Sequence, residues 1–122
     1  MLAAAVHRLD KVPQETYRKI MEVARDKDAF DTVMGLNRHL TELDLKRTGL
    51  RARLHELSIP TLIIWGEQDR YISPKLAYIA HREIPGSKLL MLPDCGHSPM
   101  LEHPEEFAAA IREFILSQPQ PH

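Results

Sequence analysis

The sequence has 122 residues, of which 43% are hydrophobic, so it allows one compact domain with its own core but not two. Its 16 Lys and Arg residues against 17 Asp and Glu residues give a formal net charge of -1, and no overall field favours nucleic acid or an anionic membrane surface. Cys95 is the single cysteine, which excludes an intrachain disulfide framework and favours a reducing compartment. No run approaches the ~20 apolar residues of a membrane span, and the apolar stretch at residues 2–6 is too short for a signal peptide. We therefore expect a cytoplasmic protein that binds neither nucleic acid nor membranes.

Helical patterns dominate residues 1–57. Pro13 suits the first position of a helix, where its missing N–H group costs nothing. Apolar residues then recur at the spacing of one helix face: Tyr17, Ile20, Met21 and Ala24. A second helix is expected with Asp28 as its N-cap. Its apolar stripe is expected at Phe30, Val33 and Met34. A third, shorter helix is indicated by Leu50, Leu54 and Leu57. The pattern predicts ordinary packing faces on these helices.

After residue 57 the pattern predicts a strand, a helix and a second strand. Pro60 ends any helix, and residues 61–65 form a continuous apolar and β-branched run that is typical of a strand buried on both faces. A Ser-Pro pair at residues 73–74 supplies an N-cap and a first helical proline for a helix that continues to about residue 83. Residues 88–92 are the second apolar run. A strand, helix, strand order implies a crossover connection and parallel pairing.

The last helix is expected to begin at Pro104, because the acidic residues directly after it suit the positive end of a helix. The residues expected to face inward are Phe107, Ile111, Phe114 and Ile115. Residues 118–122 are rich in Pro and Gln, and we expect a disordered tail. The sequence therefore predicts an α/β fold class with three parts: a helical region (1–57), a two-stranded core part (58–117) and the tail.

Asp69 and His97 follow the two predicted strands. Parallel α/β sheets carry functional groups where strands end, so we expect these two side chains to lie within reach of each other. A carboxylate that accepts a hydrogen bond from imidazole Nδ1 fixes the tautomer and stabilises the imidazolium that forms when Nε2 takes a proton. The pair is thus a candidate catalytic acid and base that needs a nucleophile. The alternative is a turn-forming aspartate and a structural histidine.

Residues 59–69 read IPTLIIWGEQD, and residues 92–107 read LPDCGHSPMLEHPEEF. The first segment resembles the penultimate strand and acid loop of the α/β-hydrolase family. The second is similar to the histidine loop and final helix of that family. The resemblance implies that Asp69 is the triad acid and His97 the general base, and that residues 1–57 are the end of a cap region that shapes the substrate pocket. The implied fold is the C-terminal part of an α/β-hydrolase, with two parallel strands and flanking helices preceded by cap-like helices.

The serine nucleophile of that family is missing. The family presents its serine on a G-x-S-x-G elbow beside an oxyanion hole, and the sequence contains no such motif. Ser98 is followed by Pro99 where the elbow needs a small residue, so Ser98 is assigned to the histidine loop. Cys95 is expected to pack and not to attack, because close neighbours on a loop seldom hold attack geometry. The remaining histidines show no metal-ligand spacing, and we expect neither metal nor cofactor.

The leading expectation is a serine-hydrolase segment that supplies the triad acid and base for hydrolysis of an ester or similar bond in a small apolar substrate, and that is inactive alone. A small-molecule substrate would bind only once the site is completed. A full hydrolase of this family has about eight strands, so the side of one of the two strands that would meet its missing neighbour is left unpaired, which favours pairing with a complementary chain or with a second copy. The alternatives are a non-catalytic interaction module and a truncated, decayed fragment.

Overall fold

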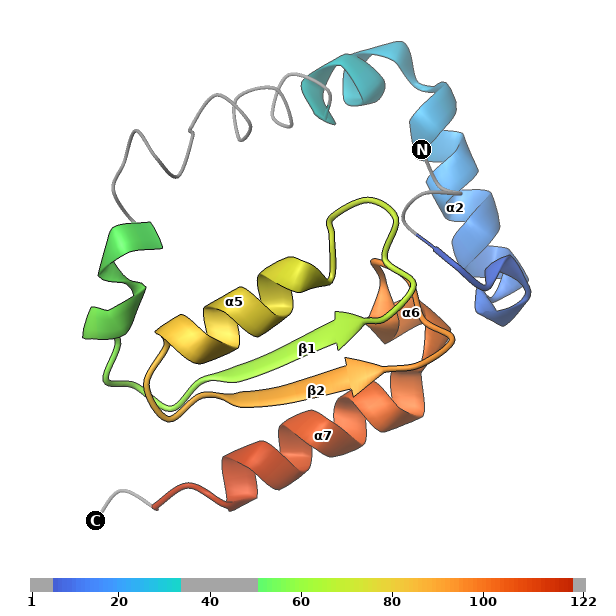
Figure 1. Ribbon diagram of the computed structural model, residues 1–122. Coiled ribbons are helices and arrows are strands. Elements are labelled where there is room, and N and C mark those ends of the chain that lie inside the picture. The colour runs from blue at the N-terminus through green and yellow to red at the C-terminus, as the bar shows by residue number, and fades with distance from the viewer. Residues whose placement is uncertain (1–5, 34–50, 120–122) are drawn as a thin grey trace. The chain divides into compact units, whose positions relative to one another are not determined.

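The computed structural model describes residues 6–33 and 51–119 (Figure 1). The chain divides into two compact units, of which one comprises Met1–Val12 with His55–His122 and the other Pro13–Leu54. The first unit carries the only sheet of the described residues, and it also holds Asp69 and His97.

The sheet consists of two parallel strands. Strand β1 spans Leu62–Gly66 and strand β2 spans Lys88–Leu92, with a register that runs from Leu62 opposite Lys88 to Gly66 opposite Leu92. Helix α5, Lys75–Glu83, connects them. The expected strand, helix, strand crossover and its parallel pairing are confirmed, and the first strand lies one residue later than expected because Gly66 still pairs. Within the described residues each strand has one neighbour, so one edge of β1 and one edge of β2 are unpaired there.

Helices α5 and α7 lie on opposite sides of this sheet (Figure 1). Helix α7 spans Pro104–Leu116 and begins at the expected proline. Ala77 of α5 is completely buried, whereas no residue of α7 is. Ile115 is 58% exposed, so the expectation that it faces inward is wrong. The strand residues before Gly66 are half-buried and not fully buried, because one helix on each side covers only part of a two-stranded sheet.

The N-terminal segment, residues 6–12, packs on the site end of this unit. It contains a short 3-10 helix, η1, at Leu9–Lys11. Val6 and Val12 are buried on either side of it, and η1 contacts α6, a one-turn helix at Pro99–Glu102. Helix α6 follows His97 directly and was not expected from the sequence. It forms because Pro99 stands at its first turn, where a proline needs no hydrogen-bond partner.

The second unit is helical where it is described. Helix α2 spans Gln14–Arg25 and starts directly after Pro13, with one apolar face and no buried residue. A further helical stretch covers residues 27–33. Its cap is Asp26, whose Oδ1 accepts the N–H of Ala29 at 2.9 Å, so the expected cap at Asp28 is wrong.

The last helical segment before the sheet is a 3-10 helix, η2, at Arg51–Glu56. Met34 and Leu50, which the sequence placed in helices, lie outside the described residues. Over residues 6–33 and 51–119, no helix has both the length and the apolar character needed to cross a membrane.

Candidate active site

Asp69 lies in the acid loop, residues 67–72, which follows β1. Its N–H donates to the carbonyl oxygen of Gly66 at 3.2 Å, which closes a turn at the strand end. Its Oδ1 accepts the N–H groups of Tyr71 and Ile72, both at 2.9 Å. This is the local bonding by which an aspartate shapes a turn. Oδ1 is therefore committed to the loop, and Oδ2 is left for another partner.

That partner is His97, in the histidine loop, residues 93–98. Asp69 Oδ2 and His97 Nδ1 lie 2.8 Å apart, so the expected proximity of the two side chains is confirmed. The Asp69 side chain is 2% exposed and the His97 side chain 35%, which shields the carboxylate and leaves the imidazole reachable. Because a carboxylate only accepts, the proton of the neutral ring belongs on Nδ1, and Nε2 keeps a lone pair. The ring of Tyr71 packs against the imidazole with centroids 5.0 Å apart.

One main-chain and one side-chain hydrogen bond join the acid loop to the histidine loop. The N–H of Gln68 donates to the carbonyl oxygen of Cys95 at 2.8 Å, and the N–H of Cys95 donates back to Gln68 Oε1 at 3.0 Å. The N–H of Glu67 donates to the carbonyl oxygen of Leu92 at 2.9 Å, which extends the strand pairing by one step. The Asp69–His97 pair therefore rests on two loops that share one hydrogen-bond ladder.

Two acidic residues hold the other side of the histidine loop. Glu102 is 2% exposed, and its carboxylate accepts the N–H of Gly96 at 2.9 Å and the N–H of Arg8 at 2.7 Å. Asp94, with a φ of 53°, accepts from the Arg8 guanidinium at 2.5 Å and lies 3.2 Å from His7 Nε2. Glu102 is thus a loop hydrogen-bonder. Sequence reasoning missed Arg8, because a contact with a residue so far along the chain leaves no local pattern.

A cavity of about 170 Å³ adjoins the pair. It is lined by Asp69 and His97 together with Ile64, Trp65, Gly66, Pro99, Met100 and Phe107. Six of these eight residues carry no charge and little polarity, so the cavity suits an apolar group placed beside an imidazole. The indole Nε1 of Trp65 is buried without a hydrogen-bond partner in the described part of the chain.

No mark of an activated nucleophile is found at Cys95, at Ser98, or at Ser87, which lies at the opposite end of β2 from His97. Cys95 is completely buried, and this burial raises the pKa of its thiol to about 12. Ser98 precedes α6, and its carbonyl oxygen accepts from that helix. Ser87 lies 2.9 Å from His81 Nδ1, but its hydroxyl donates to the His81 carbonyl oxygen, so the imidazole must donate to the serine. A general base needs the opposite direction, in which the serine hydroxyl donates its hydrogen bond to the imidazole.

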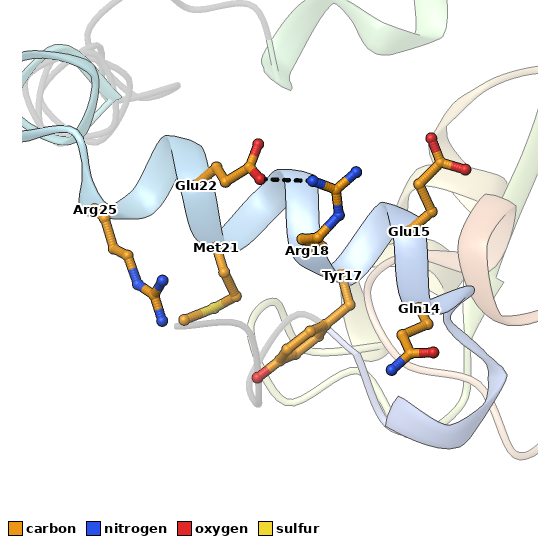
Figure 2. A pocket seen from close by; sticks show the side chains of 7 residues that line it. All are labelled: Gln14, Glu15, Tyr17, Arg18, Met21, Glu22 and Arg25. Carbon is orange, nitrogen blue, oxygen red and sulfur yellow. Dashed lines mark hydrogen bonds and ion pairs between the residues drawn. The ribbon is translucent and has the colours of Figure 1, made fainter.

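A separate hollow is lined by residues of helix α2 in the second unit (Figure 2). All seven of its lining residues belong to that one helix: Gln14, Glu15, Tyr17, Arg18, Met21, Glu22 and Arg25. Arg18 bonds to Glu22 at 2.9 Å, an ordinary pair of charges one turn apart. One exposed helix face with paired charges provides no acid and base couple.

The described residues contain no cluster of side chains that could bind a metal ion. Within residues 6–33 and 51–119, no three His, Cys, Asp or Glu side chains gather where they could hold an ion.

Comparison with known proteins settles the family. The family model described as "Alpha/beta hydrolase family" matches residues 3–110. The chain belongs to the alpha/beta hydrolase family. Its two strands, crossover helix and final helix are therefore part of that fold.

Curated relatives of this hydrolase chain include esterases and lipases. Over 70 residues, which are 57% of this chain and 27% of the other protein, it is 33% identical to a pimeloyl-[acyl-carrier protein] methyl ester esterase of Neisseria meningitidis. Over 111 residues, which are 91% of this chain and 32% of the other protein, it is 29% identical to the monoacylglycerol lipase ABHD6 of Rattus norvegicus. The chain thus spans between a quarter and a third of the length of these relatives.

Solved structures agree. An esterase from Thermogutta terrifontis is 38% identical, with a TM-score of 0.52, over 54% of this chain and 24% of that one. The α/β hydrolase MGS-MChE2, from a sediment metagenome of the Mar Chica lagoon, is 26% identical with a TM-score of 0.62, over 84% of this hydrolase chain and 45% of its own.

Proposed function

We propose that this chain supplies the acid, Asp69, and the general base, His97, of a serine-hydrolase triad that cleaves an ester of an apolar substrate. The single observation that carries the proposal is the 2.8 Å contact between Asp69 Oδ2 and His97 Nδ1, made by a shielded carboxylate and a reachable imidazole. In the chemistry of such triads, the base takes the serine proton, returns it to the leaving group, and then activates water.

Each atom of the pair has one role in this mechanism. Asp69 Oδ2 holds the ring and stabilises the imidazolium, while Oδ1 keeps the acid loop in place through its two N–H contacts. His97 Nε2 is the atom that would exchange the proton, since Nδ1 is committed to the carboxylate. The ring lines the cavity, which is where a serine and an ester carbonyl would have to meet it.

The choice of an ester of an apolar substrate follows from two independent features. The cavity beside His97 is lined largely by apolar side chains, Ile64, Pro99, Met100 and Phe107 among them. The names of two groups of relatives, a methyl ester esterase and a monoacylglycerol lipase, share ester cleavage. A burial of apolar surface near the reacting carbonyl would supply binding energy at roughly 25 cal/mol per Å².

The nucleophile would come from outside this sequence, so the chain alone should be inactive. The sequence has no G-x-S-x-G elbow, and none of the hydrogen bonds of the described residues joins a serine to His97 Nε2. The unpaired edge of β1 is the natural place for a complementary chain, or a second copy, to add a strand. Size-exclusion chromatography of the purified chain alone at two concentrations tests self-pairing, because a homodimer forms without any other chain, whereas a complementary partner has to be added.

A chimera tests the catalytic proposal directly. Residues 59–117 would replace the matching segment of the meningococcal esterase, which retains its own nucleophile-bearing part, and hydrolysis of p-nitrophenyl acetate would be measured. The expected result is an active chimera that loses about 10⁴-fold in kcat on His97→Ala or Asp69→Asn, the scale found when a triad member is removed.

The matched controls are His103→Gln and Glu67→Gln. The first replaces a histidine whose ring bonds to the Asp94 carbonyl oxygen and to Glu106 and not to the pair, and the second replaces an exposed acidic residue of the acid loop. A folded chimera with equal activity before and after His97→Ala would contradict the proposed role. The unmodified chain should hydrolyse p-nitrophenyl acetate at the same background rate as its His97→Ala variant.

The open edge of β1 favours a second candidate, a non-catalytic interaction module. Under it, complex formation would survive the double change Asp69→Asn and His97→Ala, and the chimera would be inactive.

A further inference from the structure

Glu102 is the most deeply buried carboxylate among the described residues that does not belong to the Asp69–His97 pair. It is 2% exposed at the end of α6, and among the ion pairs of the described residues none includes it. Its two oxygens accept main-chain N–H groups, Oε2 from Gly96 and Oε1 from Arg8. A buried charge is costly unless its bonds are satisfied, and here both oxygens are. What this carboxylate holds is therefore backbone.

The backbone that it holds is the N–H group of Gly96, the residue directly before His97. Gly96 is pressed from two sides: a Cβ atom on it would lie 2.6 Å from the N of His7 and 3.1 Å from Glu102 Oε2. On the other side, the Gly96 carbonyl oxygen would lie 2.0 Å from a Cβ atom on Gly66. The peptide is thus gripped between the end of β1 and the Glu102 carboxylate. Any shift of that peptide moves the imidazole relative to Asp69.

We propose that Glu102 is a positioning residue that sets the alignment of His97 with Asp69 by binding the Gly96 N–H, and that its bond to Arg8 anchors this clamp to the N-terminal segment. The proposal rests on the proposed function for its consequence in catalysis, but the alignment itself is a property of this chain. Glu102 is not one of the residues that line the cavity, and its carboxylate bonds to main-chain N–H groups and not to the imidazole. Its effect on the reaction would pass through the main chain alone.

Glu102→Gln tests the clamp with little change in volume. A glutamine has one acceptor oxygen, so one of the two N–H groups would face its NH₂ group and lose its bond. Glu105→Gln is the matched control, because Glu105 is an exposed residue at the start of the next helix and the charge change is the same. The measurements use the full chain: long-range ¹H–¹⁵N spectra of the His97 ring at about pH 9, where an imidazole is neutral, and amide exchange at Gly96 and Arg8.

The unmodified chain should hold the Nδ1–H tautomer at His97 and slow exchange at both amides. Glu102→Gln should mix the two tautomers and speed exchange at Gly96 or Arg8 by at least about tenfold, the scale of one lost bond to a charged group, while Glu105→Gln changes neither. An unchanged tautomer in folded Glu102→Gln overturns the proposal. If that variant does not fold, the unmodified chain decides: rapid exchange at Gly96, as in an unstructured peptide, also overturns it. Neither the tautomer nor the amide exchange rate depends on catalysis. An inactive chimera would therefore contradict the proposed function but not the positioning role of Glu102.

Discussion

Gly66, the last residue of β1, lies so close to the histidine loop that a Cβ atom on it would be 2.0 Å from the carbonyl oxygen of Gly96 and 2.4 Å from that of Cys95. Both neighbours are backbone, so neither moves out of the way as a flexible side chain would. We predict that Gly66→Ala lowers the free energy of unfolding by about 2–4 kcal/mol, as other overpacked core positions do. Urea unfolding followed by circular dichroism measures the change.

Gly86→Ala is the control for that substitution. Gly86 has a φ of 68°, but a Cβ atom there meets nothing within 4 Å. Its cost should be only the conformational one, about 1–2 kcal/mol. An equal or larger loss for Gly86→Ala than for Gly66→Ala would show that the close approach of Gly66 to the histidine loop is not a tight contact in solution.

Asp69→Asn should weaken the acid loop as well as the pairing with His97. The side chain of Asp69 accepts three hydrogen bonds, from Tyr71, Ile72 and His97, and an amide has only one acceptor oxygen for them. We expect a loss of about 1–3 kcal/mol in the free energy of unfolding. Glu67→Gln, an exposed neighbour on the same loop, should cost almost nothing. Equal urea midpoints for the two variants would refute the buried bonding of Asp69.

Sequence reasoning reached the sheet and the pair because both depend on local signals. The apolar runs before Gly66 and at residues 88–92 fixed two strands, and the helix between them required parallel pairing. Once the strands were parallel, the residues that follow them had to share one edge. For that reason the contact between Asp69 and His97 was predictable from the sequence alone.

The contacts that sequence reasoning missed are those made across long chain distances by residues without a pattern. Arg8 and Glu102 are 94 positions apart, and nothing in the few residues around either one indicates the other. The exposure of Ile115 was also missed, because helical spacing says which residues share a face but not how wide the sheet beneath that face is. The cap at Asp26 in place of Asp28 is an ordinary error of helix boundaries.

Cys95 should react very slowly with thiol reagents in the folded chain. Burial raises the pKa of its thiol to about 12, so at pH 8 only about one thiol in 10⁴ would be ionised, and the side chain has no exposed surface. Labelling with 5,5′-dithiobis(2-nitrobenzoate) should therefore require urea. The sign for stability follows: the free energy of unfolding should fall as pH rises from about 9 toward 12, because only the unfolded thiol ionises there. Rapid labelling without urea would place Cys95 at the surface.

His103 should make the free energy of unfolding larger in mild acid than in mild base. The hydrogen bond from its Nε2 to the carbonyl oxygen of Asp94, at 2.9 Å, raises the pKa of His103, and the contact of Nδ1 with Glu106 acts in the same direction. Only the protonated ring donates from both nitrogens, so the folded state binds this proton more tightly than the unfolded chain does. The contribution is fully present below the unfolded pKa of 6.5 and is lost as pH rises through the folded pKa.

Urea midpoints measured across this pH range should fall with rising pH, and the difference between His103→Gln and the unmodified chain isolates the part that belongs to His103. His55→Gln, a change at an exposed histidine, is the control and should leave the slope as it was. If His103→Gln also leaves the slope intact, the bond to Asp94 does not hold the proton in solution.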